Sequence, residues 1–215
     1  MRSTRAAIAV RLLDAAVGGD AGLVGRLSGL INEVYASAED GLWREGVTRT
    51  TPSEVEDLID AREIAVATVD GRLAGAIRVR ALSDVTGEFG MLAADPRYRG
   101  IGVGRQLVAF AERHCSDDGL QAMELELLVP RTFRHPSKEF LDGWYRRIGY
   151  RVMRTTSVAE VQAGLSPLLA TPCDFVIYRK PLAGGTSPWV TPRASPPRTS
   201  RRARTPRSGR GPAPT

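Results

Sequence analysis

The stretch Arg99-Gly100-Ile101-Gly102-Val103-Gly104 says most about the fold of this 215-residue chain. It follows residues 86–93, which alternate like a strand, and it opens residues 103–118, whose apolar spacing is helical. Glycines let a backbone turn tightly and leave its N–H groups unobstructed, and a helix N-terminus carries partial positive charge. The turn is therefore typical of a loop that binds a phosphate or a pyrophosphate.

Two nucleotide-binding motifs do not fit this turn. A Walker loop needs Lys and then Ser or Thr after its second Gly, and no such string occurs in the chain. A dinucleotide fingerprint that starts at Gly100 would need its third Gly at position 105, where the chain has Arg105. That fingerprint also belongs in a βαβ unit, whereas the preceding strands are joined by hairpins. What remains is the spacing Arg-x-x-Gly-x-Gly, met by Arg99, Gly102 and Gly104.

The rest of the chain predicts one α+β domain. Asp70-Gly71 joins two β-type runs in a hairpin, and with residues 86–93 these runs form an antiparallel meander. Strands are expected at residues 8–13, 63–69, 72–81, 86–93, 122–129, 150–156 and 174–179, and helices at 20–37, 52–60, 103–118 and 137–148. Asp20, Thr51 and Ser137 are the expected helix caps. A strand, helix, strand order from residue 86 to residue 129 implies parallel pairing. We expect a mixed, mostly antiparallel central sheet flanked by helices on both faces.

The positive charge is concentrated at the C-terminal end. The chain has a net charge of +6, and residues 183–215 contain seven Arg and no acid, which leaves −1 for residues 1–182. This Pro- and Arg-rich tail has too few apolar residues to offset the entropy of ordering, so we expect it to be disordered. The predicted organisation is a folded domain at 1–182 and a basic tail at 183–215. Nucleic acid is expected to bind at most weakly, through the tail.

The composition argues against a metal-binding protein, a disulfide-rich protein and a membrane protein. Two cysteines, Cys115 and Cys173, cannot build a disulfide framework, and two histidines, His114 and His135, cannot complete a zinc site without carboxylates. We therefore expect no metal. No apolar run approaches the about 18 residues of a membrane span, and residues 6–10 are too short for a signal-peptide core. We expect a soluble, cytoplasmic protein without a membrane partner.

Two motifs together resemble the GNAT superfamily of acyl-CoA-dependent N-acyltransferases. One is the Arg-x-x-Gly-x-Gly spacing, and the other is Tyr145-Arg146-Arg147-Ile148-Gly149-Tyr150, an aromatic residue before a helix end and Gly-Tyr. The resemblance covers residues 8–181 in element order. It implies an N-acetyltransferase that moves an acetyl group from acetyl-CoA, its acyl-donor cosubstrate, to a primary amine by direct attack in a ternary complex. Many such proteins dimerise, so a homodimer is one expectation.

The resemblance also implies which residues act. The acetyl-CoA contacts are expected from the backbone of the fourth strand, from the loop and from one side chain after it: Met91, Leu92, Ala93, Arg99, Gly100, Ile101, Gly102, Val103, Gly104 and Arg105. Tyr145 is the expected general acid, because a phenol with a pKa of about 10 is protonated at neutral pH and can donate to the leaving sulfur. Glu88 is the expected base, since alternation puts it on one face with Gly90 and Leu92.

Several alternatives stay open. Glu124 and Glu126 are rival carboxylates, and His135, before the last helix, is a rival base. Tyr35 and Trp43 are the expected acceptor-binding residues, because aromatic rings beside carboxylates suit a cationic amine. The alternative function is a CoA-binding sensor or pseudo-enzyme that keeps the loop without turnover.

Overall fold

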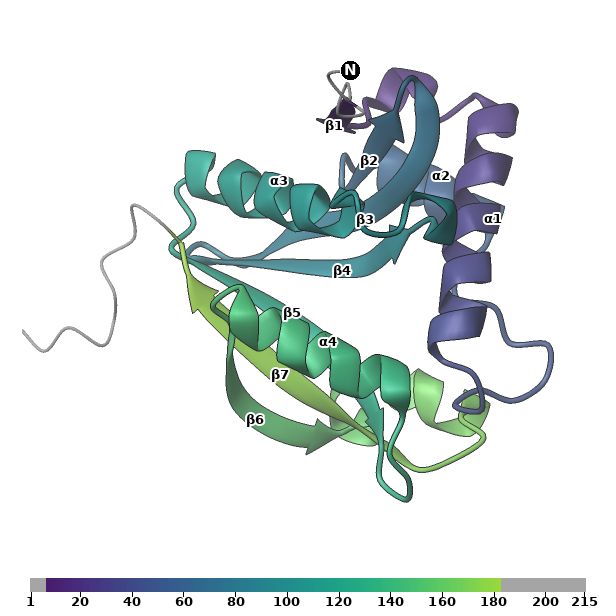
Figure 1. Cartoon of the computed structure of the whole chain (residues 1–215), viewed down its shortest axis with the longest axis vertical. Helices are drawn as coiled ribbons and strands as arrows, with labels where there is room; N and C mark the ends of the chain where they lie inside the picture. Colours follow the sequence, from purple (N-terminus) through teal and green to yellow (C-terminus); the bar gives the residue numbers. More distant parts are fainter. Residues whose placement is uncertain (1–6, 183–215) are drawn as a thin grey trace, which may run out of the picture.

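A central seven-stranded sheet organises the fold of residues 7–182, the part of the chain that the computed structural model describes (Figure 1). The strands follow the order β1-β2-β3-β4-β5-β7-β6. Their bounds are β1 Ile8–Leu12, β2 Ile64–Val69, β3 Arg72–Ser83, β4 Thr86–Ala94, β5 Ala122–Pro130, β6 Arg151–Ser157 and β7 Cys173–Pro181. Among the described strands, only β4 and β5 pair in parallel, and the other pairs are antiparallel. The predicted meander and the mostly antiparallel sheet are confirmed.

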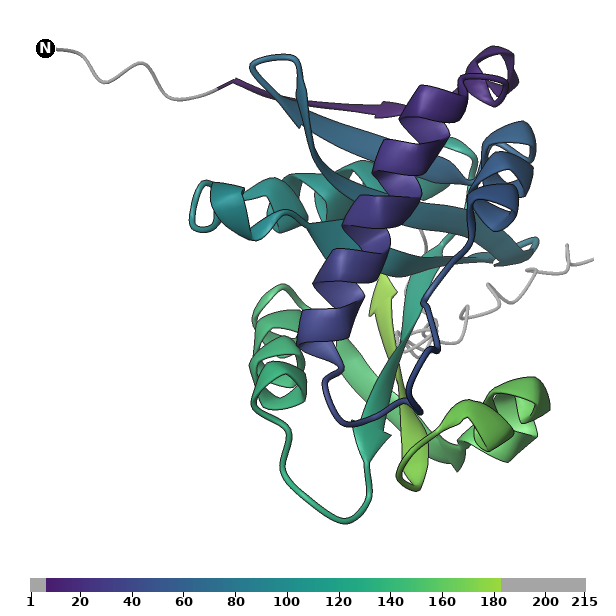
Figure 2. The ribbon, with the colours of Figure 1, turned by 90° about the vertical axis from the view of Figure 1, so that its right-hand side faces the viewer.

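Helices cover both faces of this sheet, as predicted (Figures 1 and 2). Their bounds are α1 Ala21–Ala38, α2 Pro52–Asp60, α3 Val103–Asp117, α4 Pro136–Arg147 and α5 Val158–Val161. α1 and α2 pack on one face, in a buried cluster that includes Leu27, Ile59 and Ala76. α3 and α4 pack on the other face, in a cluster that includes Leu107 and Tyr145. The predicted tail, residues 183–215, lies outside the described residues.

Helix starts follow the sequence signals in two cases and depart from them in a third. The Asp20 side chain accepts from the Leu23 N–H at 2.9 Å, and the Thr51 hydroxyl accepts from the Glu54 N–H at 3.1 Å. The prediction that Ser137 caps its helix is wrong. α4 begins at Pro136, and the residue before it makes no side-chain cap bond. Proline suits the first helical position, because the N–H that it lacks would have no partner there.

A tight hairpin turn and a close contact between β3 and the start of α3 position the Gly-rich loop. Asp70 and Gly71 have φ of 49° and 78°, the left-handed pair that a tight hairpin turn needs. A Cβ on Gly75 would lie 2.7 Å from the Ala93 carbonyl and 2.9 Å from Val103 Cγ1. Only a glycine therefore lets the start of α3 pack this closely against β3 and β4.

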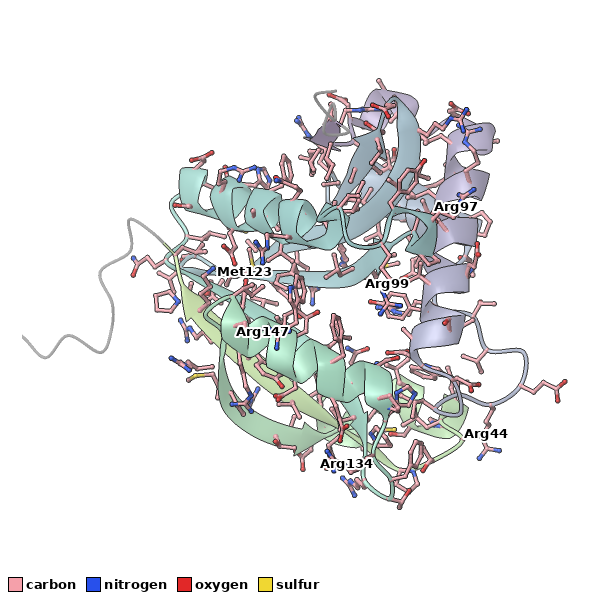
Figure 3. All side chains as sticks on the ribbon, viewed as in Figure 1. Arg44, Arg97, Arg99, Met123, Arg134 and Arg147 are labelled. Carbon is pink, nitrogen blue, oxygen red and sulfur yellow. The ribbon has the colours of Figure 1, made fainter. Side chains whose placement is uncertain are left out.

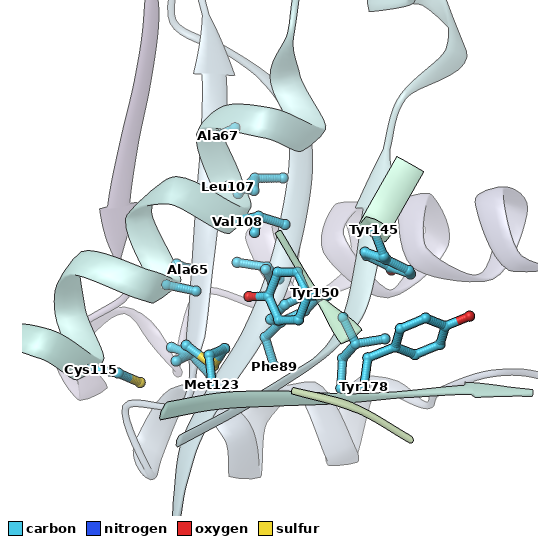
Figure 4. Packing of buried hydrophobic residues seen from close by; sticks show 14 of the residues in the cluster. Ala65, Ala67, Phe89, Leu107, Val108, Cys115, Met123, Tyr145, Tyr150 and Tyr178 are labelled. Atoms are coloured by element: carbon cyan, nitrogen blue, oxygen red, sulfur yellow. The ribbon is translucent and has the colours of Figure 1, made fainter. Parts of the chain in front are cut away.

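An aromatic cluster fills the space between α4 and the sheet (Figure 4). Phe89, Tyr150 and Tyr178 surround Tyr145, with ring centroids 5.8 to 6.1 Å from its own. Tyr150 donates to Glu112 at 2.9 Å. The packing fixes the direction of Tyr145 on α4.

The connection from β6 to β7 contains α5 and a 3-10 helix at Ala163–Leu168. It packs with the segment after α1 in a third buried cluster, which includes Leu42, Leu128 and Leu169. Backbone bonds tie the two segments together: the Arg44 N–H donates to the Leu168 carbonyl, and the Ala170 N–H donates to the Leu42 carbonyl, both at 2.9 Å. These two segments, called the wall segments below, pack against Leu128 of β5 and cover that end of the sheet.

Candidate active site

The parallel strands β4 and β5 separate soon after they begin. Their pairing covers only Thr86–Glu88 against Ala122–Glu124, although both strands continue beyond it. Figure 1 shows the two strands diverging from this shared end. A cavity of about 410 Å³ lies at the split, lined by residues of α1, β3, β4, β5, α4 and the two wall segments.

A bulge in β4 redirects its side chains at the split. Ala76 pairs with Ala93 and Arg78 pairs with Gly90, so the one residue between them on β3 faces both Met91 and Leu92. Met91 has φ of 46° and packs with the α1 and α2 cluster, whereas Leu92 packs on the α3 side. The prediction that Leu92 shares a face with Glu88 is therefore wrong, because the extra residue shifts the alternation.

The Gly-rich loop has the geometry of an anion cradle. Gly100 and Gly102 have φ of 85° and 100°, and Gly102 is the N-cap of α3 without a side-chain cap bond. The first N–H groups of a helix have no intrahelical acceptor, so the backbone at residues 103–105 can donate to a bound anion. Gly104 faces α4, since a Cβ on it would lie 3.9 Å from Trp144 Cη2. Figure 3 shows Arg99 at the same loop.

Tyr145 presents an unpaired hydroxyl to the cavity. Its side chain is 5% exposed and lines the cavity, and no hydrogen-bond partner of its hydroxyl occurs within residues 7–182. The neighbouring Tyr178 instead donates to Asp142. Burial raises the pKa of Tyr145 well above its ordinary value, and the nearby phenols of Tyr35 and Tyr178 add to the rise. The hydroxyl is therefore protonated at any physiological pH.

Two carboxylates of the same sheet face line the cavity. Glu88 on β4 accepts from Arg80 Nε at 2.6 Å. Glu126 on β5 accepts from the uncharged amide of Gln162 at 3.1 Å. Burial raises the pKa of Glu126, and the charge of Glu88 raises it further, while Gln162, Arg80 and Arg154 oppose the rise. The pKa of Glu126 thus lies above that of an ordinary carboxylate, which gives it the proton affinity that a general base needs.

The remaining candidate bases lie elsewhere. Glu124, also on β5, pairs with Arg179 at 3.5 Å and is not part of the cavity lining. His135 is buried, its Nε2 lies 3.1 Å from the Asp40 carbonyl, and it does not line the cavity. Only Glu88 and Glu126 among the sequence candidates face the cavity.

Tyr35 and Trp43, the predicted acceptor residues, both line the cavity. Trp43 Nε1 donates to Glu39 Oε2 at 2.6 Å, and Lys138 Nζ donates to Glu39 Oε1 at 2.5 Å. Glu39 and Lys138 are 7% and 4% exposed. This buried ion pair, which the sequence analysis missed, fastens the segment after α1 to α4.

Replacing Lys138 by methionine is expected to destabilise the protein by about 3 to 5 kcal/mol, because it leaves the buried carboxylate of Glu39 without its cation. Chemical denaturation measures the loss. The double variant Glu39→Gln with Lys138→Met should recover at least half of it, since no buried charge then remains. A double variant as unstable as the single one would contradict this account of the pair.

The described residues contain no helix long and apolar enough to cross a membrane and no group of three or more His, Cys, Asp or Glu side chains placed to hold a metal ion.

Comparisons with known proteins agree with this arrangement. A family profile described as "Acetyltransferase (GNAT) domain" matches residues 60–152, from the end of α2 to the start of β6. No curated protein sequence matches the chain.

Solved structures share the fold at low sequence identity. Ard1 from Thermoplasma volcanium is 16% identical, with a TM-score of 0.58, over 82% of this chain and 99% of that one. PaiA N-acetyltransferase from Thermoplasma acidophilum, solved with coenzyme A, is 18% identical, with a TM-score of 0.60, over 81% of this chain and 99% of that one. An aminoglycoside 6'-N-acetyltransferase, also complexed with coenzyme A, is 15% identical, with a TM-score of 0.62, over 83% of this chain and 99% of that one. The likeness to each concerns the fold.

Proposed function

We propose that the chain is an acetyltransferase of the GNAT type, which moves an acetyl group from acetyl-CoA to a primary amine by direct attack in a ternary complex. The match of residues 60–152 to the acetyltransferase (GNAT) profile supports this proposal. The observation that carries this proposal is the cavity at the split between β4 and β5, which brings an unpaired phenol and two carboxylates together. A cytoplasmic location, a homodimer and the division at residue 182 stay predictions from the sequence.

The donor side of the site uses backbone groups. The N–H groups of residues 100–105 bind the pyrophosphate at the N-terminus of α3, and the side chains of Arg99 and Arg105 add positive charge. The backbone of Met91, Leu92 and Ala93 binds the pantetheine arm, and the bulge and the early end of strand pairing support this role. Acetyl-CoA supplies the acetyl group as a thioester, which an amine attacks.

The acceptor amine arrives protonated and must lose a proton before it can attack. We assign this step to Glu126, whose carboxylate has a raised pKa and no cationic hydrogen-bond partner within residues 7–182. The proton passes from the ammonium group to Glu126 and then to solvent. Glu88, predicted as the base, is held by Arg80 and contributes a neighbouring negative charge that favours proton uptake by Glu126.

The leaving sulfur must gain a proton, which Tyr145 donates. Its hydroxyl is protonated, faces the cavity and is free of protein partners within the described part of the chain. The proton that the attacking nitrogen loses as the amide forms restores the phenol. Proton release from the substrate and proton donation to the thiol thus use different side chains.

Replacing Tyr145 by phenylalanine is expected to lower kcat about 100-fold, at the low end of what a general acid contributes, because a thiolate is a good leaving group. The affinity for acetyl-CoA should change less than about twofold. Calorimetry with acetyl-CoA and thiol release with a panel of primary amines measure the two quantities on the full chain.

The matched control is Tyr178→Phe, since Tyr178 packs against Tyr145 but does not line the cavity. It should keep kcat and lose about 1 kcal/mol of stability with its bond to Asp142. A Tyr145→Phe variant with wild-type kcat would contradict the assignment of the acid. Tight acetyl-CoA binding without thiol release for any amine would favour the sensor function instead.

A further inference from the structure

The cavity contains one guanidinium that no carboxylate of the described residues neutralises. Its cationic lining residues are Arg49, Arg78, Arg80 and Lys138. Three of these have carboxylate partners, namely Glu63 for Arg78, Glu88 for Arg80 and Glu39 for Lys138, at 2.5 to 2.6 Å. Arg49 has no carboxylate partner within residues 7–182. It lies over the ring of Tyr35, with its Cζ 5.1 Å from the ring centroid.

Arg49 is held in place by a rigid support. The next residue, Thr50, is 3% exposed, and its N–H donates to Asn32 Oδ1 at 2.9 Å. Asn32 Nδ2 in turn donates to the Thr50 carbonyl at 3.0 Å. These two bonds fix the backbone to α1, and the half-buried guanidinium then stacks on Tyr35 of the same helix. A positioned, unneutralised guanidinium is suited to bind a carboxylate in two parallel hydrogen bonds.

The cavity also contains carboxylates without cationic partners. Glu126 accepts from the amide of Gln162, and Glu54 accepts from the hydroxyl of Thr50 at 2.9 Å. Neither makes an ion pair with any described residue. The cavity thus has unneutralised charge of both signs, which is complementary to a zwitterion.

The size of the cavity favours a small acceptor. Its volume of about 410 Å³ lies at the low end of the range for small-molecule sites, about 300 to 1,000 Å³. The two wall segments, joined by their backbone bonds, contribute Trp43, Leu165 and Leu168 to its lining. A free amino acid fits this volume better than a segment of a folded protein.

We propose that the acceptor is a small α-amino acid whose carboxylate binds Arg49 and whose amino group meets Glu126. This inference rests on the proposed function, because it names the acceptor for the same site. The amine must reach the split between β4 and β5. The Tyr35 hydroxyl interacts both with the Arg49 side chain and with the backbone of Leu92 at this split. Both interactions oppose the rise in the pKa of Tyr35 that burial causes.

The test compares matched substrates on the full chain at saturating acetyl-CoA. Each of the common L-amino acids is assayed beside its amide and its decarboxylated amine. We expect kcat/KM for the best amino acid to exceed that of its two counterparts at least about 10-fold. Arg49→Gln should lower kcat/KM for that amino acid about 100-fold and change it less than about threefold for the decarboxylated amine.

Arg44→Gln is the matched control, because Arg44 lies in the same segment and points into solvent away from the cavity (Figure 3). It should leave every kcat/KM unchanged. The proposal is overturned if no amino acid is acetylated, if the counterparts without a carboxylate are used equally well, or if Arg49→Gln impairs all substrates equally, as a purely structural stacking role would require.

Failure of this inference can be told from failure of the proposed function. Polyamines, an aminoglycoside and a short peptide are assayed in parallel, and acetyl-CoA binding is measured by calorimetry. Acetylation of one of these amines without any amino acid overturns the substrate class alone. Absence of acetyl-CoA binding overturns the proposed function and the inference with it.

Discussion

Replacing Gly102 by valine is expected to weaken acetyl-CoA binding about 100-fold, which corresponds to about 2.8 kcal/mol. Gly102 has φ of 100° at the N-cap of α3, a conformation that a β-branched residue adopts only at a cost of about 1 to 3 kcal/mol. Relief of that strain rotates the N–H groups that would hold the pyrophosphate. The effect should be similar for acetyl-CoA and free CoA, because both carry this group.

Gly119→Val is the matched control at the opposite end of the same helix. Gly119 has φ of 83° and, like Gly102, no atom within 4 Å of an added Cβ. Both variants should therefore lose similar stability in thermal unfolding, whereas only Gly102→Val should lose affinity in calorimetry. If both variants lost affinity for acetyl-CoA equally, strain in α3 would explain the loss. If Gly102→Val bound acetyl-CoA with wild-type affinity, the loop would not be part of the binding site.

Local signals in the sequence predicted the parts of the site that short-range chemistry determines. The Gly-rich loop, the helix that carries Tyr145 and the parallel pairing of β4 with β5 all follow from turn residues, apolar spacing and element order. Tyr35 and Trp43 could be proposed because aromatic and acidic residues gather in one short segment. The signals for the loop, for the helix and for Tyr35 with Trp43 each lie within one short stretch, and the pairing of β4 with β5 follows from the order of the elements.

Features that depend on distant segments could not be predicted in this way. The bulge at Met91 depends on how β4 pairs with β3, and no glycine at that position indicates a left-handed residue. Lys138 and Glu39 are 99 residues apart, and only the packing of α4 against the segment after α1 brings them together. The same holds for Gln162, which comes from the connection after β6. Glu88 and Glu126 could not be ranked as bases before these neighbours were known.

Replacing Glu126 by glutamine is expected to lower kcat about 100- to 1,000-fold near neutral pH, because the variant cannot take the proton of the acceptor ammonium. In the wild type, activity should fall as the pH drops through the raised pKa of Glu126, since the carboxylate is then protonated. The pH profile of the variant should lack this acidic limb. Its rate should instead rise with pH until the acceptor amine itself is deprotonated. Steady-state pH profiles measure both behaviours.

The same substitution is expected to raise the melting temperature at neutral pH. Because the pKa of Glu126 is raised in the folded state, the folded chain binds more protons than the unfolded chain between the two pKa values, and stability falls as pH rises through that window. A neutral glutamine removes this cost of burying a carboxylate, so lower turnover should accompany higher stability.

Two carboxylate variants separate Glu126 from its neighbours. Glu124→Gln changes the same strand and face but lies outside the cavity lining, so it should leave the pH profile unchanged. Glu88→Gln removes a charge that favours proton uptake by Glu126, so it should move the acidic limb to lower pH with a smaller loss of kcat. A larger loss of kcat in Glu88→Gln than in Glu126→Gln, with the acidic limb abolished, would make Glu88 the base and give Glu126 the supporting role.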